Sequence, residues 1–302
     1  MREYNDKKNK QLQELLGTTS KKSIYHYTSI EALKSILEKK TLWLSDISFM
    51  NDESEIKYTF DLVCEYLDSV KKYDGEFKDF IKKGLNNIKN GYNNEMRYNY
   101  YVISFSLNPD SLPIWVYYTK NSNSAGFNIE FDKRDITSLI KNHSMIHGCL
   151  SGLVIYNKTK QKAAIRNILN KYFNMYKESP EEEAWNAPQK ASILSAFSDL
   201  LLLSLFLKSS YFKNEEEFRI VIPVLQIKDN QNIDLNFRIS NGMLIPYVEI
   251  SFKENQDVVK SITISPTLKS NLVEKGLKDF VIAQKYKNLE QNITRSKIPL
   301  RY

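Results

Sequence analysis

Apolar and polar residues recur along the chain with two different periods, which mark the predicted strands and helices. Short runs rich in β-branched and aromatic residues predict strands over residues 23–27, 41–45, 98–106, 125–131, 151–157, 215–227, 244–252, 258–266 and 279–283. Helical periodicity predicts helices over residues 28–39, 53–72, 76–89, 111–118, 158–177 and 180–208, with a short helix just before residue 279. Because the strands are scattered between helices of mixed lengths, the pattern predicts an α+β fold rather than a doubly wound sheet.

The same pattern predicts how the chain is organised. Residues 1–22 form a polar N-terminal helical extension that ends in the turn G-T-T-S, and residues 23–302 form a single α+β domain. Helical insertions are expected at about residues 53–90 and 158–208. Thr28 and Glu31 have the spacing of a capping box, which predicts that the first helix of the domain starts there. The C-terminal segment Ser296–Tyr302 joins a proline turn to apolar residues, which predicts that it packs back on the domain.

Composition narrows the class of protein. Nine glycines and eight prolines in 302 residues fit neither a collagen-like chain nor a Pro/Gly-rich disordered chain. Basic residues outnumber acidic ones by 43 to 36, which gives a net charge of +7. This excess favours contact with nucleic acid or a phosphorylated ligand. A lysine-rich surface kept for solubility is an equal alternative.

Cysteine content and hydropathy indicate in which cellular compartment the protein is expected. Cys64 and Cys149 are the only cysteines, so the sequence predicts neither a disulfide framework nor a zinc site, and a reducing cytoplasm is expected. The N-terminus is too polar for a signal peptide. The longest apolar stretch, residues 191–207, contains Asp199 and falls short of the ~20 residues of a membrane-spanning helix, which predicts a buried helix.

The segment Y-H-Y-T contains one of only three histidines in the chain. Tyr25 and Tyr27 share one face of the predicted strand, while His26 projects to the other face with Thr28. The helix that follows would supply free N–H groups suited to an anion. His26 is therefore a candidate to bond a ribose hydroxyl beside a phosphate, and a core or capping histidine is the alternative.

The segment N-E-E-E-F-R-I-V-I-P contains a second group of charged residues. Glu215, Glu217 and Arg219 alternate at the start of the predicted strand, which would place all three side chains on one face. Two close carboxylates raise each other's pKa, and a neighbouring arginine offsets that effect. Such a group suits general acid/base chemistry or the stabilisation of a cation. An edge-strand ladder of ion pairs is the alternative, with equal weight.

Two further segments are candidate parts of a site. Ser104 and Ser106 share one face of a predicted strand, and Trp115 and Tyr118 share one face of a helix, where aromatic rings can stack on a nicotinamide or a base. Packing of these rings in the protein's own core is the alternative. Asn51 and Asp52 form a predicted helix N-cap with Glu55 one turn later; no histidine is near, so capping is favoured over metal ligation.

Taken together, these segments resemble a bacterial family of proteins of unknown function. The family shares the motifs Y-H-Y-T, L-x-S-I-L, L-W-x-S, N-D-x-x-E, S-F-S, W-x-x-Y, a strand opened by glycine, E-x-E-[FW]-R and S-x-I-P-x-R. They match Tyr25–Thr28, Leu33–Leu37, Leu42–Ser45, Asn51–Glu55, Ser104–Ser106, Trp115–Tyr118, Gly126, Glu215–Arg219 and Ser296–Arg301. The resemblance covers about residues 23–302 and departs at Glu53, where proline is frequent, and at Phe218, where tryptophan is common.

The opening H-Y-T segment also resembles, more distantly, the DNA-modifying ADP-ribosyltransferase toxins and the RNA 2′-phosphotransferases. That resemblance implies a central, mostly antiparallel split sheet flanked by helices, with NAD as a substrate and no metal. It also implies an effector that acts on nucleic acid in a toxin or anti-phage setting.

The resemblance implies roles for individual residues. The residues that would hold NAD are His26, Tyr27, Thr28, Ser104, Ser106 and Tyr118, with His26 on the adenosine-side ribose. Glu217 would bond the 2′-hydroxyl of the ribose that carries nicotinamide, and Glu215 would orient or deprotonate the acceptor. Arg219 would hold the glutamates or a pyrophosphate oxygen.

A non-catalytic regulatory or nucleic-acid-binding module of the same family is the alternative. In that case Y-H-Y-T and E-x-E-F-R would form one buried polar network that holds the sheet together. The two hypotheses differ in geometry: the enzyme requires His26 and Glu217 on the wall of one open cleft, and the module buries both.

Overall fold

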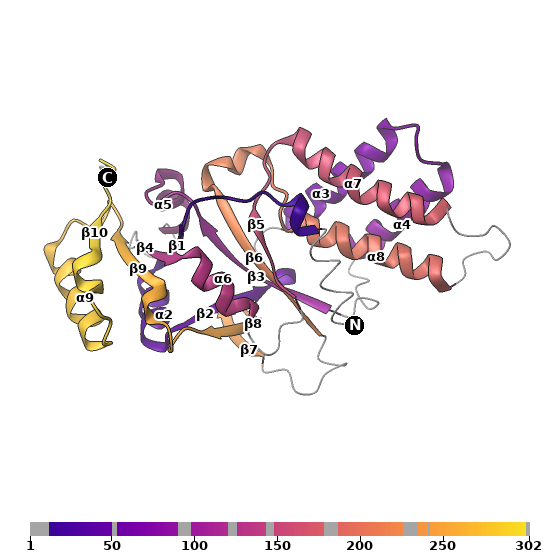
Figure 1. Ribbon diagram of the computed structural model, residues 1–302. Coiled ribbons are helices and arrows are strands. Elements are labelled where there is room, and N and C mark those ends of the chain that lie inside the picture. The colour runs from indigo at the N-terminus through magenta and orange to yellow at the C-terminus, as the bar shows by residue number, and fades with distance from the viewer. Residues whose placement is uncertain are drawn as a thin grey trace.

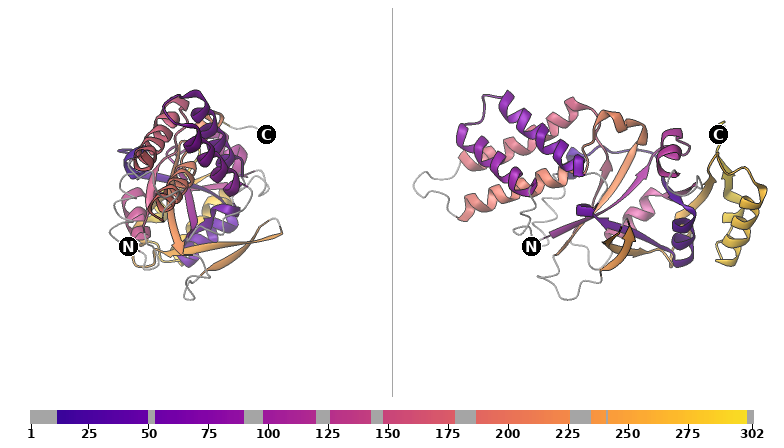
Figure 2. Two further views of the ribbon diagram at one scale, coloured as in Figure 1. Left: turned by 90° about the vertical axis from the view of Figure 1, so that its right-hand side faces the viewer. Right: turned by 180° about the vertical axis from the view of Figure 1, so that it is seen from behind.

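The molecule is elongated, with a lobe of helices at one end, a twisted sheet in the middle and helix α9 at the other end (Figures 1 and 2). The structure is a computed structural model that describes residues 12–49, 53–89, 98–119, 126–142, 148–177, 187–225, 235–240 and 242–299. The fold is α+β, as the sequence predicts.

Ten strands form one sheet in the described residues. They are β1 Ser23–Ser29, β2 Thr41–Asp46, β3 Tyr98–Ser106, β4 Gly126–Asp132, β5 Leu150–Leu153, β6 Glu217–Leu225, β7 Asn236–Ser240, β8 Met243–Ser251, β9 Val259–Ile264 and β10 Ile293–Arg295. The helices are α2 Ile30–Lys39, α3 Glu53–Ser69, α4 Gly75–Lys89, α5 Leu112–Thr119, α6 Lys133–Lys141, α7 Lys158–Lys177, α8 Ala187–Ser204 and α9 Asn271–Ala283. Short 3-10 turns include η1 Ile47–Phe49, η3 Ser210–Glu215, η5 Gln256–Val258 and η6 Leu289–Asn292.

The sheet is mixed and mostly antiparallel, because only the β9–β10 pair is parallel among the described strands. It forks at β3. On one side β3 pairs along its whole length with β6, which pairs in turn with β5. On the other side two strands share β3: β1 pairs with its end at Ser106, and β2 pairs further back at Val102 and Tyr101. Strands β4, β9 and β10 continue beyond β1, while β8 and β7 continue beyond β2.

Two hydrophobic cores lie against the two faces of the sheet. The alternation of side chains along β3 and β6 divides them, since Phe105 and Phe218 face one core and Val102 and Val221 face the other. The first core is closed by α2, α6 and α9, and the second by the lobe of α3, α4, α7 and α8. The apolar stretch 191–207 belongs to α8 and the residues after it, and it contributes side chains to the second core.

Most predicted elements are confirmed, and several need correction. Residues 279–283 are the last turn of α9 rather than a strand, because Leu277 and Val281 bury one helical face against the first core. The cap of α2 is Ser29 and not Thr28, since the Ser29 hydroxyl accepts from the N–H of Ala32. Helix α6 and strands β7 and β10 were not predicted.

The predicted packing of the C-terminal segment is confirmed for its described part. The Ser296 hydroxyl donates to Asp110 at 2.7 Å, and the Lys297 N–H donates to the other oxygen of the same carboxylate at 2.9 Å. No helix among the described residues is long and apolar enough to cross a membrane.

Candidate functional site

Three of the sequence motifs lie on three adjacent strands. Y-H-Y-T is on β1, S-F-S ends β3, and the second half of E-x-E-F-R opens β6. Tyr25 is opposite Ser106, and Ser106 is opposite Glu217, so these three residues form one row across the sheet. Ser104 is opposite Arg219 in the same β3–β6 ladder. Segments that lie far apart in the sequence are therefore brought together at one end of the central strands.

His26 lies at the fork of the sheet. Ser104 falls between the two points where β1 and β2 pair with β3, and the carbonyl oxygen of Ser104 is 3.2 Å from Nδ1 of His26. Since a carbonyl only accepts, the imidazole donates from Nδ1 and takes the place of a strand N–H. The ring also makes an edge contact with Phe105, 5.8 Å between centroids, on the side of the first core.

The charged residues of E-x-E-F-R lie on the opposite face of the sheet. Side chains alternate along a strand, so Ser104 and Ser106 project away from Phe105, and Glu217 and Arg219 project away from Phe218. That face is covered by the helical lobe. The structure therefore brings together the serines and the E-x-E-F-R charges, but it does not bring the His26 side chain to them.

Glu217 and Arg219 form a two-pronged ion pair inside the protein. Nε and Nη2 of Arg219 donate to the two carboxylate oxygens of Glu217 at 2.7 and 2.9 Å, and Nη1 donates to the carbonyl of Leu205 at 2.7 Å. Glu217 is 7% exposed and Arg219 is 1% exposed. The hydroxyl of Tyr156 accepts from the backbone N–H of Glu217. This geometry joins the start of β6 to the segment that follows α8.

Lys208 extends the network to Glu215. Its ammonium lies 2.7 Å from Glu215 and 3.6 Å from Glu217, and it is covered by the ring of Phe212. Glu215 is in the turn η3 and not in the strand, because Glu216 adopts a left-handed conformation with φ of 43° before β6 begins. The prediction that Glu215, Glu217 and Arg219 alternate along one strand is therefore wrong for Glu215. The sequence analysis did not find Lys208 or Tyr156, which no motif marks.

The network shifts the pKa values of the two carboxyl groups in opposite directions. Burial raises the pKa of Glu217, but the charges of Arg219 and Lys208 outweigh it and hold that pKa below the usual range. Burial also raises the pKa of Glu215, and Lys208 only partly offsets the effect. Burial lowers the pKa of His26, so its imidazole is held neutral. Glu217 therefore stays ionised, and its negative charge is already paired with Arg219 and Lys208.

The face of β1 opposite His26 carries a second polar cluster. The Tyr27 hydroxyl donates to the carbonyl of Asn108 and accepts from the N–H of Ser111, and its ring packs edge-on against Trp115. Trp115 Nε1 donates to Asp110, the same carboxylate that holds the C-terminal segment. The motifs Y-H-Y-T, W-x-x-Y and S-x-I-P thus meet around residues 107–111. Asp110 belongs to none of the motifs, and sequence analysis missed it.

The remaining predicted site residues contribute less. Thr28 is half-buried on β1, and Ser106 donates to the carbonyl of Glu215 and accepts from Asn108. The side chain of Tyr118 and the pair Asn51 and Asp52 lie outside the described residues. No group of three or more His, Cys, Asp or Glu side chains within the described segments is arranged to hold a metal ion.

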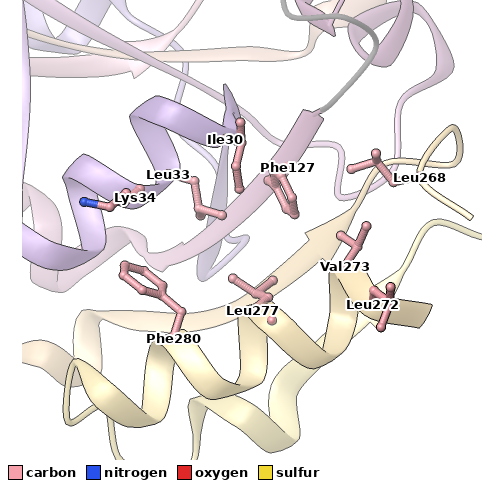
Figure 3. A pocket seen from close by; sticks show the side chains of 10 residues that line it. Ile30, Leu33, Lys34, Phe127, Leu268, Leu272, Val273, Leu277 and Phe280 are labelled. Carbon is pink, nitrogen blue, oxygen red and sulfur yellow. The ribbon is translucent and has the colours of Figure 1, made fainter. Parts of the chain in front are cut away.

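Two surface hollows are lined by other residues. One, of about 390 Å³, is apolar and lies between α2 and α9; Ile30 and Leu33 face Leu277 and Phe280 across it (Figure 3). The other, of about 430 Å³, lies between α6, the segment before β1 and Ser151 of β5. His26, Glu215 and Glu217 line neither of these two hollows.

Comparison with known families identifies one part of the chain. Residues 114–220 match the model of a family described as a protein of unknown function, DUF2971. This part of the chain is thus similar to DUF2971. The matched range runs from α5 through the first residues of β6, and so includes Trp115, Gly126 and the E-x-E-F-R segment, but not His26. No curated protein and no solved structure matches the chain.

Proposed function

We propose that this chain is a binding module, of the regulatory or nucleic-acid-binding kind, and that its motif residues hold together the sheet that carries the binding surface. The observation that carries this proposal is the saturation of E-x-E-F-R: Glu217 and Arg219 are buried and paired with each other, and Lys208 closes the network. A buried pair with every oxygen engaged has little capacity left for a substrate.

The remaining motif residues have structural contacts of the same kind. His26 donates a hydrogen bond to the carbonyl of Ser104 at the fork of the sheet, and the hydroxyl of Tyr27 holds the segment that follows β3. A surface built on such a framework needs no catalytic group, and the net charge of +7 suits an anionic ligand. The part of the chain that matches DUF2971 thus contributes its E-x-E-F-R segment to the framework.

ADP-ribosyl transfer is the second candidate, and one specific observation favours it. Tyr25, Ser106 and Glu217 form a row across adjacent strands, so the strands of the three motifs are neighbours, as a composite site would require. In this reaction the bond between nicotinamide and ribose C1′ breaks with its electron pair leaving on nicotinamide. The acceptor's nucleophile then bonds C1′ and gives up its proton.

The residues would act by charge in that case. The Glu217 anion would bond the ribose 2′-hydroxyl and favour the positive charge that grows on the sugar. Glu215, whose pKa burial raises, would take the acceptor's proton. His26 projects to the other face of the sheet, so this candidate gives it no contact with the ribose that Glu217 would bond.

One experiment separates the two candidates. The wild-type protein is incubated with labelled NAD and cell lysate beside Glu217→Gln and the matched control Glu216→Gln, whose side chain is exposed one position earlier. Folding of each variant is checked by circular dichroism. The binding module predicts no label transfer by any of the three. Transfer by the wild type and by Glu216→Gln, absent from a folded Glu217→Gln, would overturn it in favour of the enzyme.

A further inference from the structure

The hollow beside α6 is lined by basic side chains on one helical face. Lys133, Thr137 and Lys141 follow one another at intervals of four residues, and Arg134 and Ser138 do the same beside them. Ile136 and Ile140 on the other face are buried in the first core, which fixes how the helix is turned. The polar face of α6 is therefore held toward the hollow. In Figure 1, α6 lies in front of the sheet.

The cations of this face have no acidic partner in the part of the chain that the structure describes. Within the described segments, Lys133, Arg134 and Lys141 form no ion pair, and no aspartate or glutamate lines the hollow. Asp132, the nearest acidic residue in sequence, caps the helix by accepting from the N–H of Asp135. Like charges gathered without counter-charges destabilise a surface slightly, and a bound anion relieves that cost.

The opposite wall supplies neutral donors and acceptors. Thr18, Thr19 and Ser151 contribute hydroxyl groups, and the side chain of Phe218 reaches the hollow from β6. The wall is fixed in place, because Gln13 exchanges two hydrogen bonds with the backbone of Ser151 and Lys133 donates to the carbonyl of Thr19. A hollow of about 430 Å³ falls within the range of ligand sites.

We infer that this hollow is a binding site for a nucleotide, with Arg134 and Lys141 on its phosphates and the hydroxyl groups of the walls on its sugar. Arginine and lysine at exposed positions form charge-assisted bonds to phosphate oxygens, while hydroxyls match a ribose. The nucleotide is either free or part of a nucleic-acid chain, since both present the same phosphate and sugar. The inference rests on the proposed binding function. It names the class of ligand and the hollow in which the ligand binds.

The test compares two double variants of the full chain. Arg134→Ala with Lys141→Ala removes the two exposed cations of the hollow, and the matched control, Lys253→Ala with Lys275→Ala, removes the same charge at exposed positions elsewhere. Calorimetric titrations use a nucleoside triphosphate, as the free mononucleotide, and an eight-nucleotide single-stranded RNA. We expect the hollow variant to bind at least about tenfold more weakly than the wild type, and the control to stay within about twofold.

The two probes distinguish the sources of the nucleotide. Tighter binding of the RNA, with a steeper fall in affinity as salt is raised, assigns a nucleic-acid chain, and equal or tighter binding of the mononucleotide assigns the free ligand. Equal losses in both double variants, or no binding of either probe to the wild type, would overturn the inference. Amide exchange of the wild type gives an independent readout, since the bound probe should protect residues 12–19 and 133–142. These outcomes are separate from NAD label transfer, so a failure of the inference can be told apart from a failure of the proposed function.

Discussion

The imidazole of His26 donates from Nδ1 to the carbonyl oxygen of Ser104, 3.2 Å away, at the point where β1 and β2 separate along β3. A forked sheet leaves a stretch of its central strand without a partner on one edge, and a buried, unpaired carbonyl is costly. His26 supplies the missing donor from a side chain. This relationship explains why one of the three histidines of the chain stands in this strand.

The first prediction concerns pH. The fold lowers the pKa of His26 from its ordinary value of 6.5 because the ring is buried. As pH falls below 6.5, the unfolded chain therefore binds this proton first, and the free energy of unfolding decreases by up to about 1.4 kcal/mol per pH unit. The stabilisation is complete above 6.5 and is lost as the pH falls toward the lower folded value. Urea unfolding at several values between pH 5 and 8 measures it.

His26→Asn is the matched variant for that experiment. The Asn amide can donate from the same position to the Ser104 carbonyl but does not titrate. The contacts of His26 within the described residues, the Ser104 carbonyl and the Phe105 ring, do not titrate either. The variant should therefore lack the wild type's extra loss of stability below pH 6.5. Identical pH slopes for the two proteins would contradict a neutral, buried imidazole.

The second prediction concerns the pair Glu217 and Arg219. Arg219→Met leaves a buried carboxylate without its main partner and should lower the free energy of unfolding by about 3–5 kcal/mol. Glu217→Leu should have a cost of similar size. The double variant should recover much of the loss, because neither charge remains unpaired. Chemical denaturation of the four proteins gives the coupling energy.

The exposed pair Lys34 and Glu38 on α2 is the control for that cycle. It has the same charge types at 2.5 Å, but both side chains reach solvent. Its coupling energy should not exceed about 0.5 kcal/mol. A coupling as small as this between Glu217 and Arg219 would show that the buried pair is not the structural link that the geometry indicates.

The third prediction concerns Asp110. Its carboxylate accepts from Trp115, Ser296 and Lys297, so Asp110→Ala removes three contacts at once. We expect a loss of about 2–3 kcal/mol in stability and faster amide exchange in residues 293–298. Asp279→Ala, an exposed position on α9, should change neither quantity. Unchanged exchange in residues 293–298 of Asp110→Ala would mean that other contacts hold the C-terminal segment.

The local pattern of apolar and polar residues was sufficient to predict most helices and strands, and each wrong prediction can be traced to the residues of its own segment. Residues 279–283 read as a strand because Phe280, Val281 and Ile282 are consecutive apolar residues, a pattern that a half-buried helix end also produces. Helix α6 carries its signal in Ile136 and Ile140, four residues apart with polar residues around them, and that spacing would have found it. Glu215 read as part of a strand because a left-handed residue such as Glu216 has no signature in a run of glutamates.

The sequence by itself determined the α+β class, the order of nearly all elements and the packing of residues 296–299 against the domain, because these follow from the local period of apolar residues and from turn chemistry. Only the tertiary structure decided which face of the sheet each polar motif occupies. Strand order sets that relationship, and strand order arises from contacts between distant segments. Hence His26 and Glu217, though both near β3, project to opposite faces, and an unpredicted helix carries the cations that line the second hollow.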